Sequence, residues 1–411
     1  MPTVSTRRVV ITGMGAISPL GVGAAALWQG LREGRSAIGP LRHPDAERLR
    51  VKVAAQVPES FDPAAHIDER TLPLLDRTSE FALHAAREAV AQSGVDFAGG
   101  LGLRTAVIVG TGVGGETTQD EQSRRLYAEN APRAHPLTIV RLMTNASASQ
   151  ISIAYGLHGP TYAVASACAC ASANHAIIQA AQMIRYGLAD AAVTGGTEAC
   201  LTYGALRAWE AMRVVADDTC RPFSANRRGL VLGEGAAIFV LESLEHAQAR
   251  GATILAELAG TGMSADASDI VMPSAEGAAT AMRLALAEAE LNPQDVDYIN
   301  AHGTGTQAND VTETRAIRLA FGAYADRLAV SSTKSMHGHA LGASGALELV
   351  AAIGALREGV VPPTANLDKV DPACDLDYVP NTAREMPVRA VLSNSFAFGG
   401  LNAVLALKRA P

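Results

Sequence analysis

Short apolar runs, each closed by glycine or a small polar residue, recur along the whole chain. One series comprises VVITGMG from Val9, TAVIVGTGVGG from Thr105, TYAVASACAC from Thr161 and AAVTGGTEA from Ala191. A second series comprises ELAGTGMSAD from Glu257, DYINAHGTGT from Asp297, LAVSSTKSMHGH from Leu328 and AVLSNSFAFGG from Ala390. Apolar runs without strict alternation are typical of strands buried on both faces. We therefore predict two series of buried strands.

Between these strands lie alanine-rich segments in which apolar residues recur every three or four positions. They comprise residues 80–92, 171–186, 276–290 and 344–357. This spacing predicts helices, so strand and helix alternate and the chain is expected to be an α/β protein with helices covering its sheets. The two parallel series predict two related halves, residues 1–250 and 251–411.

Composition narrows the class of protein. The chain has 34 basic and 41 acidic residues, a formal charge of −7, and so lacks the basic surplus of a nucleic-acid-binding protein. Its five cysteines are odd in number and have no paired spacing, which favours a reducing compartment, the cytoplasm, over a disulfide framework. They are Cys168, Cys170, Cys200, Cys220 and Cys374.

The uncharged stretch at residues 9–30, preceded by Arg7 and Arg8, superficially resembles a signal peptide or membrane span. Several glycines and Pro19 interrupt it, and its first piece has the β-branched run and glycine stop of a buried strand. We therefore expect a core strand and no membrane segment.

The polar groups with chemical potential follow apolar runs. In open α/β sheets, residues beyond the carboxyl ends of strands converge in a crevice. Cys170 is expected where a strand turns into the helix at 171–186, and the positive end of a helix favours a thiolate. His302 and His339 follow two later strands, and the glycine-rich turn at 394–402 can aim backbone amides into a cavity.

Together these segments resemble the β-ketoacyl synthase family, especially its type II condensing enzymes, over essentially the whole chain. The matching segments are RRVVITGMGAISPLG, the cysteine turn, TCRPFSANRRGLVLGEGA, NAHGTGT, SSTKSMHGH and NSFAFGG. The resemblance implies a thiolase-like, five-layered αβαβα fold of two pseudo-repeated halves, normally a homodimer. It also implies decarboxylative condensation of an acyl-cysteine intermediate with malonyl-(acyl carrier protein).

Residue by residue, the resemblance implies that Cys170 takes the acyl chain as a thioester. His302 and His339 would then hold the malonyl thioester carbonyl as decarboxylation produces an enolate. The amides of Cys170 and Phe398 would receive the tetrahedral oxyanion, and Lys334 would order His339.

Other residues are implied as supporting or substrate-binding groups. Glu348 and Asp310 match acidic positions that support the site, although a buried polar role for Glu348 and a helix-capping role for Asp310 with Glu313 stay open. Thr304 and Thr306 would meet the phosphopantetheine arm. The expected lining of the acyl pocket is Val113, Trp209 and Phe396.

No metal or bound cofactor is expected, because substrates arrive on carrier protein and imidazole N–H groups stabilise an enolate without a metal. A Cys-x-Cys metal site would need two further ligands, for which the sequence offers no obvious set. Arg207 and Arg213 are candidates for a surface that docks the acidic carrier protein, with ordinary solvated arginines as the alternative.

Two departures from the family pattern matter. The family has a single cysteine at this turn, and here Cys168 and Cys170 compete. Two extra residues in a strand preserve its alternation, whereas two in a helix rotate everything beyond them by about 200°, which favours Cys170. Ala397 and Leu401 replace a common glycine and threonine, and we expect Ala397 to restrict the loop that moves Phe398.

The sequence leaves the acyl chain length and the pathway open. The segments around LRAWEAMRV and DTCRPFSANRRGLVLGEGA look particularly like ketosynthases of nodulation-factor acyl-chain synthesis, which raises a specialised acyl pathway beside primary fatty acid synthesis. Trp209, where related enzymes often have a smaller aromatic residue, would shorten or redirect the pocket. A non-catalytic chain-length subunit and an acetyl-CoA thiolase are the alternative functions.

Overall fold

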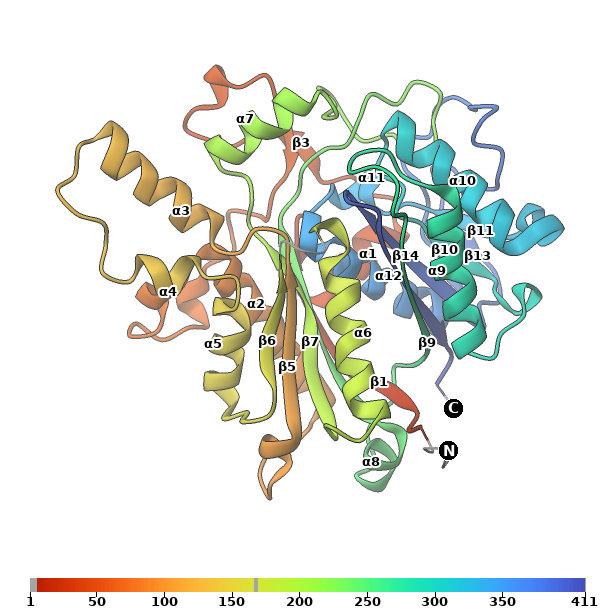
Figure 1. Cartoon of the computed structure of the whole chain (residues 1–411), viewed down its shortest axis with the longest axis horizontal. Helices are drawn as coiled ribbons and strands as arrows, with labels where there is room; N and C mark the ends of the chain where they lie inside the picture. The colour runs from red at the N-terminus through yellow and green to blue at the C-terminus, as the bar shows by residue number, and fades with distance from the viewer. Residues whose placement is uncertain (1–5, 166–168, 411) are drawn as a thin grey trace.

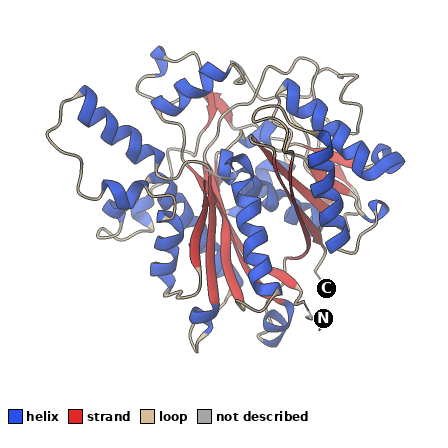
Figure 2. Cartoon of the chain, in the orientation of Figure 1, coloured by secondary structure: helices blue, strands red, loops and turns tan. Residues whose placement is uncertain are grey.

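The computed structural model describes residues 6–165 and 169–410. Cys168, the alternative to Cys170 as nucleophile, lies outside these described residues. The described chain is built on two groups of five strands, covered and separated by helices (Figures 1 and 2).

The first group of strands lies side by side in the order β6-β5-β7-β8-β1. In this group β5 is parallel to β6 and β7, whereas β8 is antiparallel to both β7 and β1. The strands are β1 (Val9–Ser18), β5 (Thr105–Thr111), β6 (Thr161–Ala165), β7 (Ala191–Glu198) and β8 (Gly235–Ser243).

The second group repeats this order as β11-β10-β14-β15-β9, with the same parallel and antiparallel pairings. Its strands are β9 (Ala256–Ala265), β10 (Tyr298–Asn300), β11 (Ala329–Ser331), β14 (Ala390–Ala397) and β15 (Leu401–Lys408). The first residues of β1 pair with β9, which makes the two groups one continuous sheet. The predicted α/β fold of two pseudo-repeated halves is confirmed.

Helices form three layers around these strands. On the outer face of the first group lie α2 (Arg77–Ser93) and α5 (Ala146–Tyr155), and on that of the second lie α9 (Ala275–Glu288) and α10 (Gln307–Phe321). Between the groups lie α6 (Ser172–Arg185) and α12 (Ser344–Glu358), which contact strands of both. Nearly every residue of α12 is buried, as expected for a helix enclosed on all sides. The four predicted helices correspond to α2, α6, α9 and α12.

The outer helices pack on the strands by the same device in both halves. A Cβ added to Gly13 or Gly15 of β1 would lie 2.1 Å from a carbonyl oxygen of α2. A Cβ added to Gly260 or Gly262 of β9 would lie 2.3 or 2.0 Å from a carbonyl oxygen of α9. Glycine at these positions lets helix backbone lie directly on strand backbone, which only a residue without a side chain allows.

Smaller elements complete the described chain. The helices are α1 (Ala24–Arg32), α3 (Glu116–Ser123), α4 (Thr138–Leu142), α7 (Tyr203–Met212), α8 (Leu244–Ala249) and α11 (Lys334–His337). Short strands are β2 (Gly21–Val22), β3 (Ile38–Pro40), β4 (Val53–Ala55), β12 (Val360–Val361) and β13 (Arg384–Glu385). Within the described ranges, every helix is too short or too polar to cross a bilayer.

Candidate active site

Cys170 lies at the corner between β6 and α6. It is the middle residue of a single 3₁₀ turn, Ala169–Ala171, directly before α6 begins at Ser172. Ala169 has φ 39°, a left-handed conformation that residues with a Cβ seldom adopt. The Ser172 hydroxyl donates to the Ala169 carbonyl oxygen at 2.7 Å and closes the turn. This strained turn holds Cys170, which is buried, at the N-terminus of α6.

His302 follows β10, on a loop whose backbone is fixed by a buried carboxylate. The N–H groups of His302 and Gly303 donate to the two carboxylate oxygens of Glu313, at 2.8 and 2.7 Å. Gly303 has φ 36°, and a Cβ there would lie 2.5 Å from Ser332. Strand end and helix α10 therefore fix the backbone from which the His302 ring projects.

His339 follows α11 after the chain reverses at Gly338, which has φ 70°. Its backbone N–H donates to the Val231 carbonyl oxygen at 2.7 Å. Its ring Nδ1 lies 2.7 Å from the hydroxyl of Ser344, the first residue of α12. The His302 and His339 rings meet nearly edge to face, with centroids 5.5 Å apart.

Lys334 contacts His302, and the expectation that it orders His339 is wrong. Its ammonium donates to the His302 carbonyl oxygen at 2.6 Å, lies 3.5 Å from His302 Nδ1, and forms a buried ion pair with Glu348. Lys334 is the first residue of α11, whereas His339 follows the left-handed residue Gly338 after that helix. The two residues therefore belong to different parts of the connection. The group that contacts the His339 ring is Ser344.

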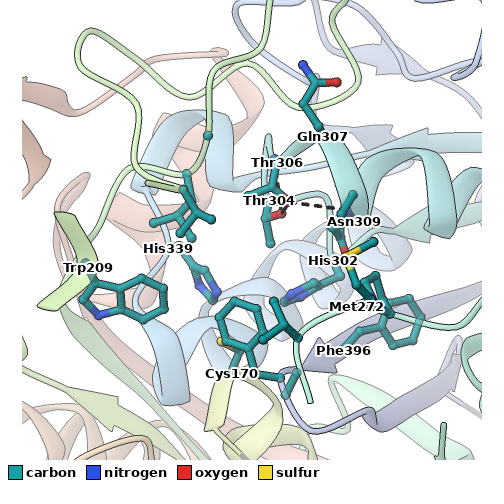
Figure 3. A pocket seen from close by; sticks show the side chains of 18 of the residues that line it. Cys170, Trp209, Met272, His302, Thr304, Thr306, Gln307, Asn309, His339 and Phe396 are labelled. Atoms are coloured by element: carbon teal, nitrogen blue, oxygen red, sulfur yellow. Dashed lines mark hydrogen bonds between the residues drawn. The ribbon is translucent and has the colours of Figure 1, made fainter. Parts of the chain in front are cut away.

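One cavity of about 340 Å³ joins these side chains (Figure 3). Cys170 lies at its base, and the rings of His302 and His339 point into it from the second half. The predicted substrate-binding residues that also line it are Thr304, Thr306, Trp209 and Phe396, and the predicted supporting residue Phe398 lines it too. Residues from four strand ends and from α7 therefore converge on a single space, as the sequence pattern predicted.

Four predicted residues do not line this cavity: Lys334 and Glu348, which form the ion pair behind His302, and Val113 and Asp310. Val113 does not line this cavity: it is 40% exposed, in the loop after β5, where its N–H donates to Glu198 at 3.4 Å. Asp310, fully buried on α10, accepts the N–H groups of Phe223 and Gly305 at 2.7 and 3.2 Å. Its contacts therefore hold the loop of Thr304 and Thr306 without reaching the cavity.

Burial sets the protonation states in the cavity. Burial, together with the nearby Lys334 charge, holds the pKa values of His302 and His339 well below their usual range, so both imidazoles are neutral at physiological pH. Burial raises the pKa of Cys170 to about 12, against a smaller opposing effect of Lys334. Burial therefore opposes the expected effect of the helix N-terminus, which favours a thiolate, and in this state Cys170 is a thiol.

Sequence reasoning missed two residues that hold the histidines. Glu313 was considered only as a helix cap, yet it fixes the His302 backbone and also accepts from Asn394 at 3.2 Å. Its spacing of three from Asp310 was a usable signal, because it places both carboxylates on one face of a helix. Ser344 gave no such signal, since its contact with His339 depends on the turn between them.

A thiolase-like α/β fold with one cysteine and two neutral histidines on a shared cavity defines a condensing enzyme of the ketosynthase class. Residues 6–247 match the N-terminal domain of beta-ketoacyl synthases, and residues 255–368 match the C-terminal domain. The chain therefore belongs to the beta-ketoacyl synthase family, and the family resemblance is confirmed.

Named relatives cover nearly the full length of the chain. Nodulation protein E of Rhizobium sp. (strain N33) is 52% identical over 403 residues, 98% of this chain and 99% of the relative. The 3-oxoacyl-[acyl-carrier-protein] synthase 2 of Coxiella burnetii is 43% identical over 411 residues, with 98% and 99% covered. A type II polyketide ketosynthase, solved in complex with its acyl carrier protein, is 30% identical with TM-score 0.88, covering 99% of this chain and 100% of its own.

Proposed function

We propose that this chain is an acyltransferase, a β-ketoacyl-(acyl carrier protein) synthase, which extends an acyl chain by decarboxylative condensation with malonyl carrier protein. The observation that supports this most is the single cavity shared by Cys170, His302 and His339, in which each neutral imidazole has one N–H donor and one nitrogen that can accept a proton. A sulfur nucleophile and two hydrogen-bond donors are what a two-step acyl condensation requires.

In the first step the Cys170 sulfur attacks the thioester of acyl carrier protein. A new C–S bond forms at Cys170, the bond to the carrier sulfur breaks, and the Cys170 proton passes to the departing thiolate. Because Cys170 is a buried thiol, a neutral imidazole of the cavity is suited to accept its proton transiently. The amides of Cys170 and Phe398 would receive the oxyanion, as the family resemblance implies.

In the second step malonyl carrier protein enters and loses carbon dioxide, and the electron pair of the broken C–C bond forms an enolate. N–H groups of His302 and His339 hold the enolate oxygen. The enolate carbon attacks the acyl-cysteine carbonyl, so a C–C bond forms and the C–S bond to Cys170 breaks. The Cys170 sulfur leaves as a thiolate and takes up one proton from water. The buried Lys334–Glu348 pair supports this step by holding His302.

The same cavity suggests how substrates are held. Thr304 and Thr306, whose hydroxyls lie 2.9 Å apart on its wall, are suited to the polar phosphopantetheine arm. Trp209 lies against Phe398, with ring centroids 6.2 Å apart, and would limit the space available to an acyl chain. Val113 lies outside this cavity, so we do not assign it to the acyl pocket. The proposal covers elongation in either fatty acid or specialised acyl synthesis.

Carrier protein would dock at the mouth of this cavity. Arg213 and Arg228 line it, and a basic rim complements an acidic carrier protein. Arg207 does not line the cavity and donates to Glu210 at 2.8 Å, so we expect it to contribute less. Reversing the charge of Arg213 and Arg228 together is expected to raise the KM for carrier-protein substrates. Unchanged KM and turnover would reject this docking surface.

We further propose that the protein forms a cytoplasmic homodimer. Within each chain, the boundary between the two halves lies near residue 250. The edge of the first group of strands is β6, whose unpaired side is a template for a second copy. Nearby helices and turns carry exposed apolar side chains, among them Tyr127, Ile139 and Ile153. Their burial against a partner would explain this exposure. Light scattering that reports a monomer at micromolar concentration would reject the dimer.

The experiment that tests the function uses the full-length chain with acyl and malonyl carrier proteins. We expect acylation of one cysteine, release of carbon dioxide, and a condensed product in equal amount. A chain that becomes acylated without condensing would instead be an accessory or chain-length subunit.

A further inference from the structure

Glu198, the last residue of β7, is a fully buried carboxylate outside the cavity. All of its hydrogen-bond partners are donors. Its Oε2 accepts from the N–H groups of Gly112 and Gly342 at 2.6 and 2.9 Å. Its Oε1 accepts from the Thr111 hydroxyl at 3.1 Å and the Val113 N–H at 3.4 Å. Buried carboxylates are costly, so four such donors in one place indicate a built site.

These partners come from both halves of the molecule. Thr111 ends β5 in the first half and residues 112 and 113 follow it, whereas Gly342 belongs to the turn before α12 in the second half. The two backbones touch here: a Cβ on Gly342 would lie 2.2 Å from the Gly112 nitrogen. Glu198 therefore joins the end of β5 to the histidine-bearing segment of the other half, at a contact too close for a side chain on Gly342.

The turn that Glu198 holds connects directly to the candidate active site. Gly342 lies between His339 and Ser344, the residue whose hydroxyl contacts the His339 ring. Leu341, next to it, packs in the same cluster as Cys170 and has φ 40°, a strained conformation for a residue with a side chain. The strained turn needs an external restraint to keep this conformation, and the Gly342–Glu198 hydrogen bond supplies one.

We infer that Glu198 is a positioning residue, which sets His339 against Cys170 by clasping the His339–Ser344 turn to the first half of the fold. This inference rests on the proposed condensation. A carboxylate is needed because two acceptor oxygens serve four donors, and an amide would turn one acceptor into a donor facing an N–H group. Aspartate has the acceptors but is shorter by one methylene, so it would not span both loops.

The carboxylate also affects Cys170 through its charge. Its negative charge is one of the causes that raise the pKa of Cys170. Burial raises the pKa of Glu198 itself to about 7, so at pH 8 most of the carboxylate is ionised. Removing the charge should make the Cys170 thiolate easier to form, whereas loosening the turn should impair His339. Loss of positioning therefore lowers the rate of condensation, whereas loss of the charge raises the reactivity of the Cys170 thiol.

The test compares Glu198→Gln and Glu198→Asp with the wild-type chain. For Glu198→Gln we expect condensation by the pre-acylated enzyme to fall at least about tenfold, from the lost buried charge-assisted hydrogen bonds. Alkylation of Cys170 by iodoacetamide at pH 8, located by peptide mass spectrometry, should at the same time become faster. For Glu198→Asp, which keeps the charge, condensation should fall and alkylation should stay at the wild-type rate.

Glu88→Gln is the matched control. Glu88 also accepts backbone N–H groups, from Ala16 and Ala24 at 2.9 Å, but within the first half and away from the cavity. Its variant should condense at the wild-type rate. Condensation within threefold of wild type in both Glu198 variants would overturn the inference, as would equal losses in the Glu88 and Glu198 variants. A wild-type chain that does not condense would reject the proposed function instead, because the alkylation comparison needs no condensation.

Discussion

The two halves share one strand order, but they differ in the segments that connect the strands. After the third strand, the first half turns into α6 within a few residues and presents Cys170, whereas the second half takes residues 332–343 to reach α12 and presents Lys334 and His339. After the fourth strand the lengths are reversed. Residues 199–234 of the first half carry α7 and Trp209, and the second half has only the turn 398–400 with Phe398.

This difference separates scaffold from chemistry. Strand order, the antiparallel last strand and the glycine contacts between helix and strand are duplicated, and they create two equivalent sheet edges. The connections are not duplicated, so one edge supplies a nucleophile and the other supplies hydrogen-bond donors. The site is therefore complete only where the two edges face each other, as expected when function resides in loops on a rigid scaffold.

The largest effect should come from removing the nucleophile of the first half. Cys170→Ala is expected to abolish acylation, because no other group in the cavity forms a thioester. Cys168→Ala, the matched control, should still be acylated. Intact-protein and peptide mass spectrometry after incubation with acyl carrier protein gives the answer. An acyl group on Cys168 would reverse the assignment and move the nucleophile out of the 3₁₀ turn.

The next largest effect should come from the second half. His302→Ala and His339→Ala are each expected to lower the rate of condensation by about 10²–10³, the usual cost of losing one oxyanion donor. Acylation should be affected less in each single variant, because the remaining neutral imidazole can still accept the Cys170 proton. Single-turnover assays of each step separate the two. Equal losses in both steps would show that the halves do not divide the chemistry as their connections indicate.

The pH dependence of Cys170 alkylation tests the same division between a nucleophile in the first half and its proton acceptor in the second. Its raised pKa, about 12, means that the thiolate fraction should grow about tenfold per pH unit from pH 7 to 10, with no plateau near 8.5, the usual thiol pKa. The rate of alkylation by iodoacetamide, followed at Cys170 by peptide mapping, measures this. A plateau below pH 8 would mean that the corner alone activates the thiol, without a proton acceptor from the second half.

The sequence predicted the duplicated scaffold better than the contacts between halves. Eight strands were visible as apolar runs with glycine or polar ends, but β8 and β15 were not identified. Only three residues separate the end of β14 from the start of β15, so the sequence shows no clear break between the turn and the strand. β8 begins inside the motif at residues 219–236, which is interpreted as a family motif and not as the start of a strand. Cys170, His302 and His339 were found because each lies on a connection that follows a strand.

Contacts that cross from one connection to another carried no local signal. The Lys334 ammonium was expected on His339, which is near in sequence, yet it contacts His302 from another strand end. Glu198 is the terminal residue of a predicted strand, and nothing nearby in sequence indicates that it meets Gly342. Register and strand ends follow from periodicity, whereas pairing across two halves depends on how separate loops fold together.

The smallest effect should come from the short turn of the second half, residues 398–400, and it depends on how freely this turn moves. Ala397 ends β14, lines the cavity, and accepts an N–H from Gly400 at 3.1 Å. Ala397→Gly removes the methyl group and frees the backbone, a difference of about 0.5–1 kcal/mol, so acylation should become faster by no more than a few fold. Stopped-flow acylation measures it, with Ala208→Gly, on exposed α7 of the long connection, as the control of similar backbone cost. Equal acylation rates in Ala397→Gly and the wild-type chain would show that the Phe398 turn moves without hindrance from Ala397.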